Sequence, residues 1–186
     1  MQGTRRRRSR GQAVTELVLV IPILAWLMLG AADMGRAYYL SVEISGSARA
    51  GLRAGITGGQ QDIGLALRSE PNSAIPNSAA AWGSYATANC TASVQTCGST
   101  SGCRPSDFTG NQTACFAVRT GTYAAGGCTF PVAGGWNTRP ASNSDGCLGV
   151  RVVYKFQPAT PLIAQLAGGS GGYFYLTADN DSLELY

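Results

Sequence analysis

An uncharged apolar run near the N-terminus constrains this chain more than any other feature. Residues 17–32 contain no charged side chain, and five arginines precede them within residues 1–10. The twenty residues 13–32 would form about 30 Å of helix, roughly the thickness of the hydrocarbon core of a bilayer. Basic residues that flank an apolar helix are held on the cytoplasmic side. We therefore expect a transmembrane helix over residues 12–32, with the N-terminus inside and the following chain outside.

Two residues of this run are unusual for a helix that only anchors a protein. Glu16 lies at its N-terminal edge, where drawing an ionised carboxylate into lipid costs a few kcal/mol. Pro22 removes one helical hydrogen bond, although neighbouring helices can satisfy the freed carbonyl group. Each residue also has a plain structural explanation, because Glu16 can reach back to the interface and prolines are common in membrane helices.

Gly11 gives this pair of residues a second interpretation. A cut after Gly11 would make Gln12 the first residue and Glu16 the fifth residue of an apolar helix. This arrangement resembles the class III leader of type IV pilins, although Leu17 stands where processed members commonly have Tyr or Phe. The resemblance implies a prepilin peptidase site between Gly11 and Gln12, and a role for Glu16 and Pro22 in subunit assembly. The new N-terminal ammonium, once buried among packed helices, would need the Glu16 carboxylate of a neighbouring subunit as its partner.

Further motifs resemble the TadE-like family, the pseudopilins of tight-adherence (Tad) pili. Residues 48–55, Ala-Arg-Ala-Gly-Leu-Arg-Ala-Gly, are similar to the signature that closes the long N-terminal helix of that family. Residues 33–37, Asp-Met-Gly-Arg-Ala, resemble the family segment just outside the membrane, and residues 150–163 are similar to its strand and Thr-Pro-Leu turn. The resemblance implies that the helix signature consists of Asp33, Arg36, Arg49, Gly51 and Arg53.

The same resemblance implies a function and a location. The chain would be a minor pilin or pseudopilin, a structural or assembly component of a Tad-type pilus used in adhesion. Its partners would be other pilin or pseudopilin subunits, the Tad assembly machinery, prepilin peptidase and the inner membrane. The globular domain would lie outside the cytoplasm and could be incorporated in a cell-surface pilus.

The formal net charge of +4 does not indicate a nucleic-acid partner. Residues 1–11 hold five of the fourteen basic residues and no acidic one, which leaves nine basic and ten acidic residues in the rest of the chain. The basic excess therefore belongs to the leader, where it sets membrane topology, and no basic footprint for nucleic acid is left elsewhere.

Six cysteines lie within residues 90–147, and the chain has no histidine and no Cys-x-x-Cys pair. Zinc binding and thiol redox chemistry are therefore not expected, and neither is a metal or another cofactor. Three disulfide bonds fit an extracytoplasmic domain better. Six cysteines allow 15 pairings, so the sequence leaves the connectivity open among Cys90, Cys97, Cys103, Cys115, Cys128 and Cys147.

These features predict an α+β architecture, a long N-terminal helix packed on a small antiparallel sheet with a loop-rich, disulfide-bonded insert. We expect a cleavable leader over residues 1–11, a transmembrane helix over 12–32, its extracytoplasmic continuation over 33–56 and a globular domain over 57–186. The insert spans residues 90–147. In the continuation, Met34, Tyr38 and Val42 recur at four-residue spacing beside a second apolar face of Leu40, Ile44 and Leu52, so one side can pack on a domain or a neighbour.

Periodicity predicts further elements in the globular domain. Residues 62–69 read as a short helix that Pro71 ends, and residues 72–110 contain too few large apolar side chains to fold by burial alone. Alternation predicts strands at 114–118, near Tyr123, and at 148–156, with Arg151 and Lys155 opposite an apolar face. Thr160 and Pro161 would start a short helix that ends at Ala167. A turn at 168–172 and strands at 173–178 and 183–186 would complete the sheet.

Four other interpretations compete with the pilin interpretation. A secreted or membrane-tethered disulfide-rich binding protein would use residues 1–32 as a signal, with Gly30 and Ala32 at the cleavage positions. A tethered enzyme finds little support, because no Ser-His or Cys-His couple exists and residues 98–102 lack the serine position of a nucleophile elbow. Calcium at residues 179–181 is less favoured than a solvated turn, since the spacing of an EF-hand loop is missing. A glycan surface of Tyr123, Trp82 and Trp136 competes with plain core packing.

Overall fold

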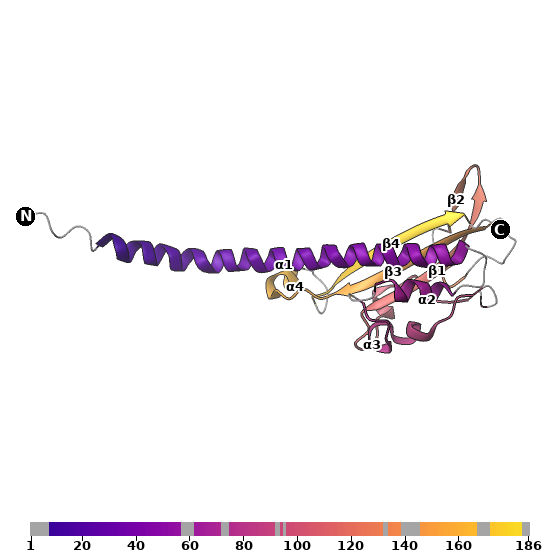
Figure 1. Cartoon of the computed structure of the whole chain (residues 1–186), viewed down its shortest axis with the longest axis horizontal. Helices are drawn as coiled ribbons and strands as arrows, with labels where there is room; N and C mark the ends of the chain where they lie inside the picture. Colours follow the sequence, from indigo (N-terminus) through magenta and orange to yellow (C-terminus); the bar gives the residue numbers. More distant parts are fainter. Residues whose placement is uncertain are drawn as a thin grey trace, which may run out of the picture.

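The computed structural model of the chain describes residues 8–56, 62–71, 75–91, 94, 96–131, 134–138, 146–166 and 172–183. Its dominant element is helix α1, Arg8–Ile56, whose 49 residues form a rod of about 74 Å at 1.5 Å per residue. The globular part packs on the C-terminal portion of α1, and the N-terminal portion projects away from it (Figure 1). Pro22 lies inside α1, and the helix continues through it.

Four antiparallel strands form the sheet, which confirms the α+β prediction. They are β1 (Ala114–Ala124), β2 (Gly127–Thr129), β3 (Gly146–Phe156) and β4 (Phe174–Leu183), in the order β2-β1-β3-β4. The register places Val118 opposite Val150 and Val152 opposite Ala178, so that small and β-branched side chains line up across the central strands. The β1–β2 connection is a tight turn in which Ala125 and Gly126 both have positive φ.

The core lies between one face of the sheet and the C-terminal portion of α1. Strands β1 and β3 alternate as predicted, and Phe116, Val118, Leu148, Val150 and Val152 are all buried on this face. Helix α1 contributes Leu40, Ile44 and Ala48, and helix α2, Ile63–Ser69, contributes Ile63 and Leu67. Met34, Tyr38 and Val42 are exposed, so the domain covers only the second of the two predicted apolar faces.

The segment between Pro71 and β1 contributes more to the core than its composition suggests. It contains helix α3 (Ala79–Trp82) and the 3-10 turns η1 (Gly83–Thr87) and η2 (Pro105–Asp107). Trp82 is fully buried, and its ring and that of Tyr85 meet Phe116 edge-on at 6.4 and 5.8 Å. The segment therefore folds by burial around one tryptophan as well as by disulfide bonds, and Trp82 belongs to the core.

The C-terminal elements differ from the prediction at one point. Helix α4 spans Pro161–Leu166, and residues 167–171 and 184–186 lie outside the described residues. Strand β4 continues without a turn through Asp179, Asn180 and Asp181, where the sequence predicts a solvated turn. That prediction is wrong because both aspartates pair with arginines of other strands, Asp179 with Arg151 of β3 and Asp181 with Arg119 of β1, which offsets the low strand propensity of an acidic run.

Candidate functional site

The predicted cleavage site lies within α1 and is exposed. The Gln12 amide donates a hydrogen bond to Glu16 Oε1 at 3.3 Å, one helical turn away, and the Thr15 hydroxyl donates to the Gly11 carbonyl at 3.0 Å. A Cβ placed on Gly11 would meet none of the described residues within 4 Å. Because a glycine inside a helix costs about 1 kcal/mol relative to alanine, packing against the described part of the chain does not explain Gly11.

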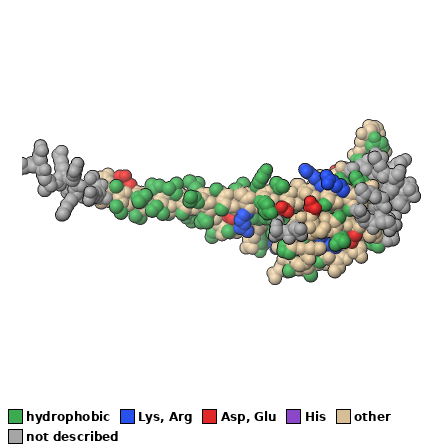
Figure 2. Space-filling model, viewed as in Figure 1, with side chains coloured by type: hydrophobic (Ala, Val, Ile, Leu, Met, Phe, Trp, Pro, Cys, Tyr) green, Lys and Arg blue, Asp and Glu red, His purple; other side chains and the backbone are tan. Residues whose placement is uncertain are grey.

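The apolar side chains of the projecting part of α1 are bare on all sides. Twelve large ones between residues 14 and 29 are 46 to 75% exposed, and Figure 2 shows hydrophobic side chains along the projecting rod. Glu16 and Pro22 lie on this uncovered part. The helix is long and apolar enough to cross a membrane, and its composition is compatible with a single-pass anchor. Such a surface requires lipid or other helices around it.

Asp33 joins the projecting and the packed parts of α1. Its carboxylate is 2% exposed and accepts hydrogen bonds from the backbone N–H groups of Ala159 and Thr160 at 3.0 and 2.8 Å. The Thr160 hydroxyl donates a third bond at 2.6 Å. These bonds, that from the Thr160 side chain foremost, lower the pKa of Asp33 despite its burial. Two motifs 127 residues apart in the chain are thus fastened together at the start of α4.

Arg36 completes this junction on the solvent side. Its guanidinium lies 3.5 Å from Asp33 and 5.7 Å from the centre of the Phe156 ring, at the end of β3. Helix α4 packs alongside the same stretch of α1, where Ile163 approaches Gly30. The signature residues Asp33 and Arg36 therefore dock the connection between β3 and α4 onto the helix just beyond the predicted membrane span.

The second signature segment, residues 48–55, packs against the domain on one side of the helix and is exposed on the other side. A Cβ on Gly51 would lie 3.1 Å from Leu67 of α2, and one on Gly55 would overlap the buried Leu148 of β3. These glycines allow the close approach of α1 to the domain. Arg49 and Arg53 are exposed on the other side. The two signature segments lie about 20 Å apart along the rod, so they form two sites rather than one.

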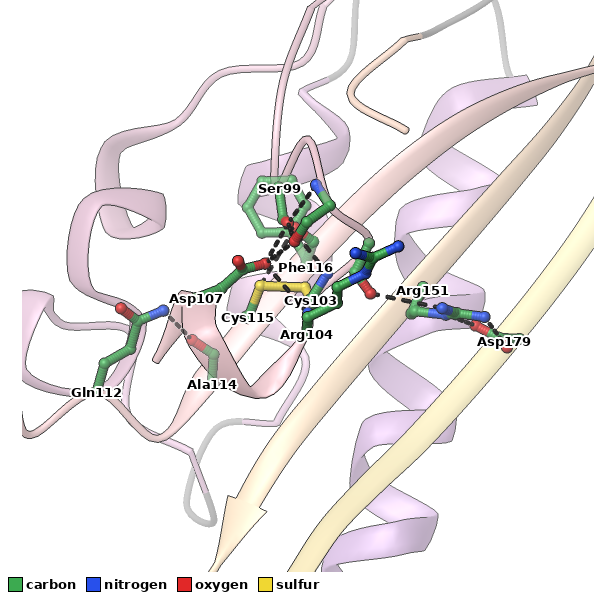
Figure 3. The surroundings of a disulfide bond; sticks show 12 residues. Ser99, Cys103, Arg104, Asp107, Gln112, Ala114, Cys115, Phe116, Arg151 and Asp179 are labelled. Atoms are coloured by element: carbon green, nitrogen blue, oxygen red, sulfur yellow. Dashed lines mark hydrogen bonds and ion pairs between the residues drawn. A yellow bond between two sulfur atoms is a disulfide. The ribbon is translucent and has the colours of Figure 1, made fainter. Parts of the chain in front are cut away.

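The structure pairs all six cysteines in chain order, Cys90–Cys97, Cys103–Cys115 and Cys128–Cys147. Figure 3 shows the second bond, which ties the loop after Gly98 to β1. In the same loop the Asp107 carboxylate accepts bonds from the Ser99 and Ser101 hydroxyl groups. Desolvation raises the pKa of Asp107, but the bonds from Ser101 and Ser99 outweigh it, so that the pKa is lowered. The serines of this loop hold its shape.

Two arginine side chains contact the Trp136 ring. The guanidinium carbons of Arg119 and Arg151 lie 4.9 and 4.4 Å from its ring centre, and Arg119 also stacks on Phe130 at 4.2 Å. Arg151 is in turn held by Asp179 at 2.6 Å and by the Gly102 carbonyl, as Figure 3 shows. Of the aromatic residues considered for a glycan surface, Trp82 is buried in the core, and the half-buried Trp136 ring already stacks with two guanidinium groups.

Sequence reasoning does not identify the partners of Asp33. It places Ala159 and Thr160 in the Thr-Pro-Leu turn and expects the Thr160 hydroxyl to cap α4. The Thr160 carbonyl does accept the first helical bond, from Ala164 at 3.1 Å, but the hydroxyl donates to Asp33. The signal available in the sequence is a lone acidic residue between apolar neighbours, because a buried carboxylate requires donors.

The model of the TadE-like protein family matches residues 11–53. The resemblance of the N-terminal helix to the TadE-like family is confirmed. The matched range contains Gly11, Glu16, both residues of the Asp33 junction that lie on α1, and the arginines of the second signature segment. The TadE-like range ends before α2, and the globular domain lies beyond it. Comparison with curated proteins and with solved structures gave no match.

Proposed function

We propose that this chain is a minor pilin or pseudopilin of a Tad-type pilus. It is inserted in the inner membrane by residues 12–32, is cut between Gly11 and Gln12, and then joins other subunits through its N-terminal helix. The observation that carries this proposal is the TadE-like match over residues 11–53, on a helix whose first part is apolar and uncovered. That match supports an association with pilus proteins in general. The role of a minor pilin or pseudopilin is the more specific part of the proposal.

The arrangement around Gly11 supports processing by a prepilin peptidase. A peptidase must fit the backbone beside the cut, which a residue without a side chain allows. The fold gives no other reason for a glycine at this position. Arginines before the site would hold the leader at the cytoplasmic face, where such a peptidase would meet it.

Glu16 supports assembly after the cut. In the uncut chain its carboxylate already meets the Gln12 side chain, one turn earlier. Once Gln12 carries a free ammonium, a carboxylate at this depth of a neighbouring helix would compensate that charge in a medium without water. Both groups would then be paired in the filament, and neither has to enter lipid as an isolated ion.

A signal peptide cut after Ala32 explains the structure less well. Such a cut would remove Gly30, which Ile163 of α4 packs against, and would place Asp33 at a frayed chain end. The junction of Asp33 with Ala159 and Thr160 is built on a helix that continues in both directions. These contacts favour retention of residues 12–32.

Replacement of Glu16 by Gln tests the proposal. Losing one member of a buried ion pair costs about 3 to 5 kcal/mol, so recovery of Glu16→Gln with other pilus subunits should fall by about two orders of magnitude or more. Membrane insertion and the cut after Gly11 should be unchanged. Glu43→Gln on the packed part of α1 is the matched control and should assemble normally. Normal pilus assembly by Glu16→Gln would refute the assigned role.

A further inference from the structure

A cavity of about 590 Å³ opens where α1 leaves the predicted membrane span. Four segments line it. They are Arg36 on α1, the loop at 110–113 before β1, the stretch 154–159 at the end of β3, and Tyr173 before β4. Chain segments that are distant in sequence thus meet at the end of the domain nearest the projecting part of α1 (Figure 1). The cavity is open to solvent beside the Asp33 junction.

The charged side chains that line this cavity are both cations, Arg36 and Lys155. Each is held against an aromatic ring, Arg36 at 5.7 Å from Phe156 and the Lys155 ammonium at 4.0 Å from Tyr173. The Asp33 carboxylate forms an ion pair with Arg36 at 3.5 Å and also accepts three hydrogen bonds from Ala159 and Thr160. Asp33 itself does not line the cavity, and Arg36, Lys155 and Asp33 together carry one net positive charge, which leaves the cavity suited to an anion.

The position of the cavity relative to the membrane follows from its place along helix α1. Arg36 lies four residues beyond Ala32, about 6 Å along the rod from the expected end of the hydrocarbon core. Helix α4, with the sequence Pro-Leu-Ile-Ala-Gln-Leu, lies still nearer the membrane, because a Cβ placed on Gly30 would lie 3.7 Å from Ile163. An apolar helix at this level would rest in the interface. The cavity then lies at the height of the phospholipid headgroups, where phosphate is the abundant anion.

We propose that this cavity binds the phosphate group of an anionic phospholipid from the outer face of the membrane. The guanidinium of Arg36 matches phosphate oxygens with paired donors, and Lys155 adds a second charge. Asn111 and Gln157 supply amide donors at the cavity wall for the polar part of the headgroup. Bound lipid would hold the domain against the membrane before the subunit is extracted. The proposal rests on the membrane insertion proposed above, and it does not depend on the cut after Gly11.

Lipid retention by the full chain tests this site. The chain is extracted in detergent with equal amounts of phosphatidylglycerol and phosphatidylcholine, and bound lipid is counted by native mass spectrometry. At about 1 kcal/mol for each basic residue, Arg36→Gln with Lys155→Gln should lower phosphatidylglycerol retention roughly thirtyfold. Arg49→Gln with Arg53→Gln removes the same charge elsewhere on the chain and should retain lipid as the wild type does. Arg36→Lys with Lys155→Arg should restore most of the binding.

Three other outcomes of the lipid assay overturn the proposal. Equal loss in both double variants would mean that net charge, not this cavity, attracts the lipid. Equal retention of phosphatidylcholine by the wild type would exclude an anionic ligand. Full displacement of lipid by millimolar inorganic phosphate would assign the cavity to a soluble phosphate compound. Recovery of the chain outside the membrane fraction would remove the lipid site together with the proposed insertion, whereas an uncut N-terminus would contradict only the processing.

Discussion

The two portions of helix α1 are continuous in structure and opposite in their surroundings. Large apolar side chains between residues 14 and 29 are at least 46% exposed, whereas Leu40, Ile44 and Ala48 are at most 8% exposed under the domain. Both portions contain large apolar side chains, but residues 17–32 carry no charge, whereas residues 33–56 include five charged side chains. The difference lies in what surrounds them, since the domain covers one face of the second portion and the first needs lipid or other helices on every side.

Glycines mark the same difference along the helix. Gly51 and Gly55 sit where α2 and β3 approach too closely for a side chain, and Gly11 and Gly35 face open space. Packing within this chain therefore explains why Gly51 and Gly55 are glycines. A glycine in open space within a helix is a cost of about 1 kcal/mol, which points to a contact made outside the chain. For Gly11 we assign that contact to the peptidase.

Reduction of the disulfide bonds should separate the two portions most strongly. Each bond contributes about 2 to 4 kcal/mol, so the loss of all three is comparable to the whole stability of a typical domain, about 5 to 15 kcal/mol. The reduced domain should become protease-sensitive after Ile56, while the apolar portion stays in the membrane through alkaline extraction. Thiol counting on the denatured, unreduced protein should find no free cysteine. Six free thiols in protein from its native envelope would contradict the assigned compartment.

Replacing glycine by alanine should change the stability of the chain in opposite directions at two positions of α1. Gly55→Ala places a Cβ against the Leu148 side chain without room for it and should lower the free energy of unfolding by about 3 kcal/mol. Gly35→Ala meets open space and should raise helix stability by up to about 1 kcal/mol. Denaturant unfolding of the full chain in detergent, followed by near-ultraviolet circular dichroism, measures both. Equal destabilisation by the two variants would mean that the packed portion of α1 includes Gly35.

Acid should open the junction between the two portions. The pKa of Asp33 is below its ordinary value of 3.8, so its contribution is fully present above about pH 4 and is lost as the pH falls through the lower, folded value. Asp33→Asn should remove about 2 kcal/mol at neutral pH and abolish this acid dependence. Hydrogen-exchange protection factors of the Ala159 and Thr160 amides report the opening. Unchanged protection in Asp33→Asn would show that other contacts hold α4 on the helix.

The fold is predictable where periodicity is strong. Strand β3 has its apolar face, Arg151 and Lys155 as expected, and α2 begins after Asp62. The unpredicted part depends on long-range pairing. The run Asp179 to Asp181 is typical of a turn, and its pairing with β3 and with two arginines across the sheet keeps it in a strand. Cysteine spacing leaves 15 pairings, and the structure selects one of them.

The sequence predicts the separate motifs of the site, but it does not predict how distant residues come together in space. Resemblance to known motifs predicts roles for Gly11, Glu16 and the two helix signatures, and the family match covers them as far as Arg53, whereas their individual roles stay predictions. The contact of Asp33 with Thr160 joins residues 127 positions apart, and neither residue alone indicates the other. The cavity between Arg36 and Lys155 escapes prediction for the same reason, since each cation lies in an otherwise ordinary element.

The mature N-terminus tests the central claim most directly. Mass spectrometry of the protein from its native envelope should find a chain that begins at Gln12, because the portion of α1 after Gly11 is retained to meet lipid and neighbouring subunits. Gly11→Leu should remain longer by the eleven leader residues, since a branched side chain obstructs the peptidase. A wild-type chain that begins at Asp33, or one that keeps Met1 in assembled pili, would contradict the account.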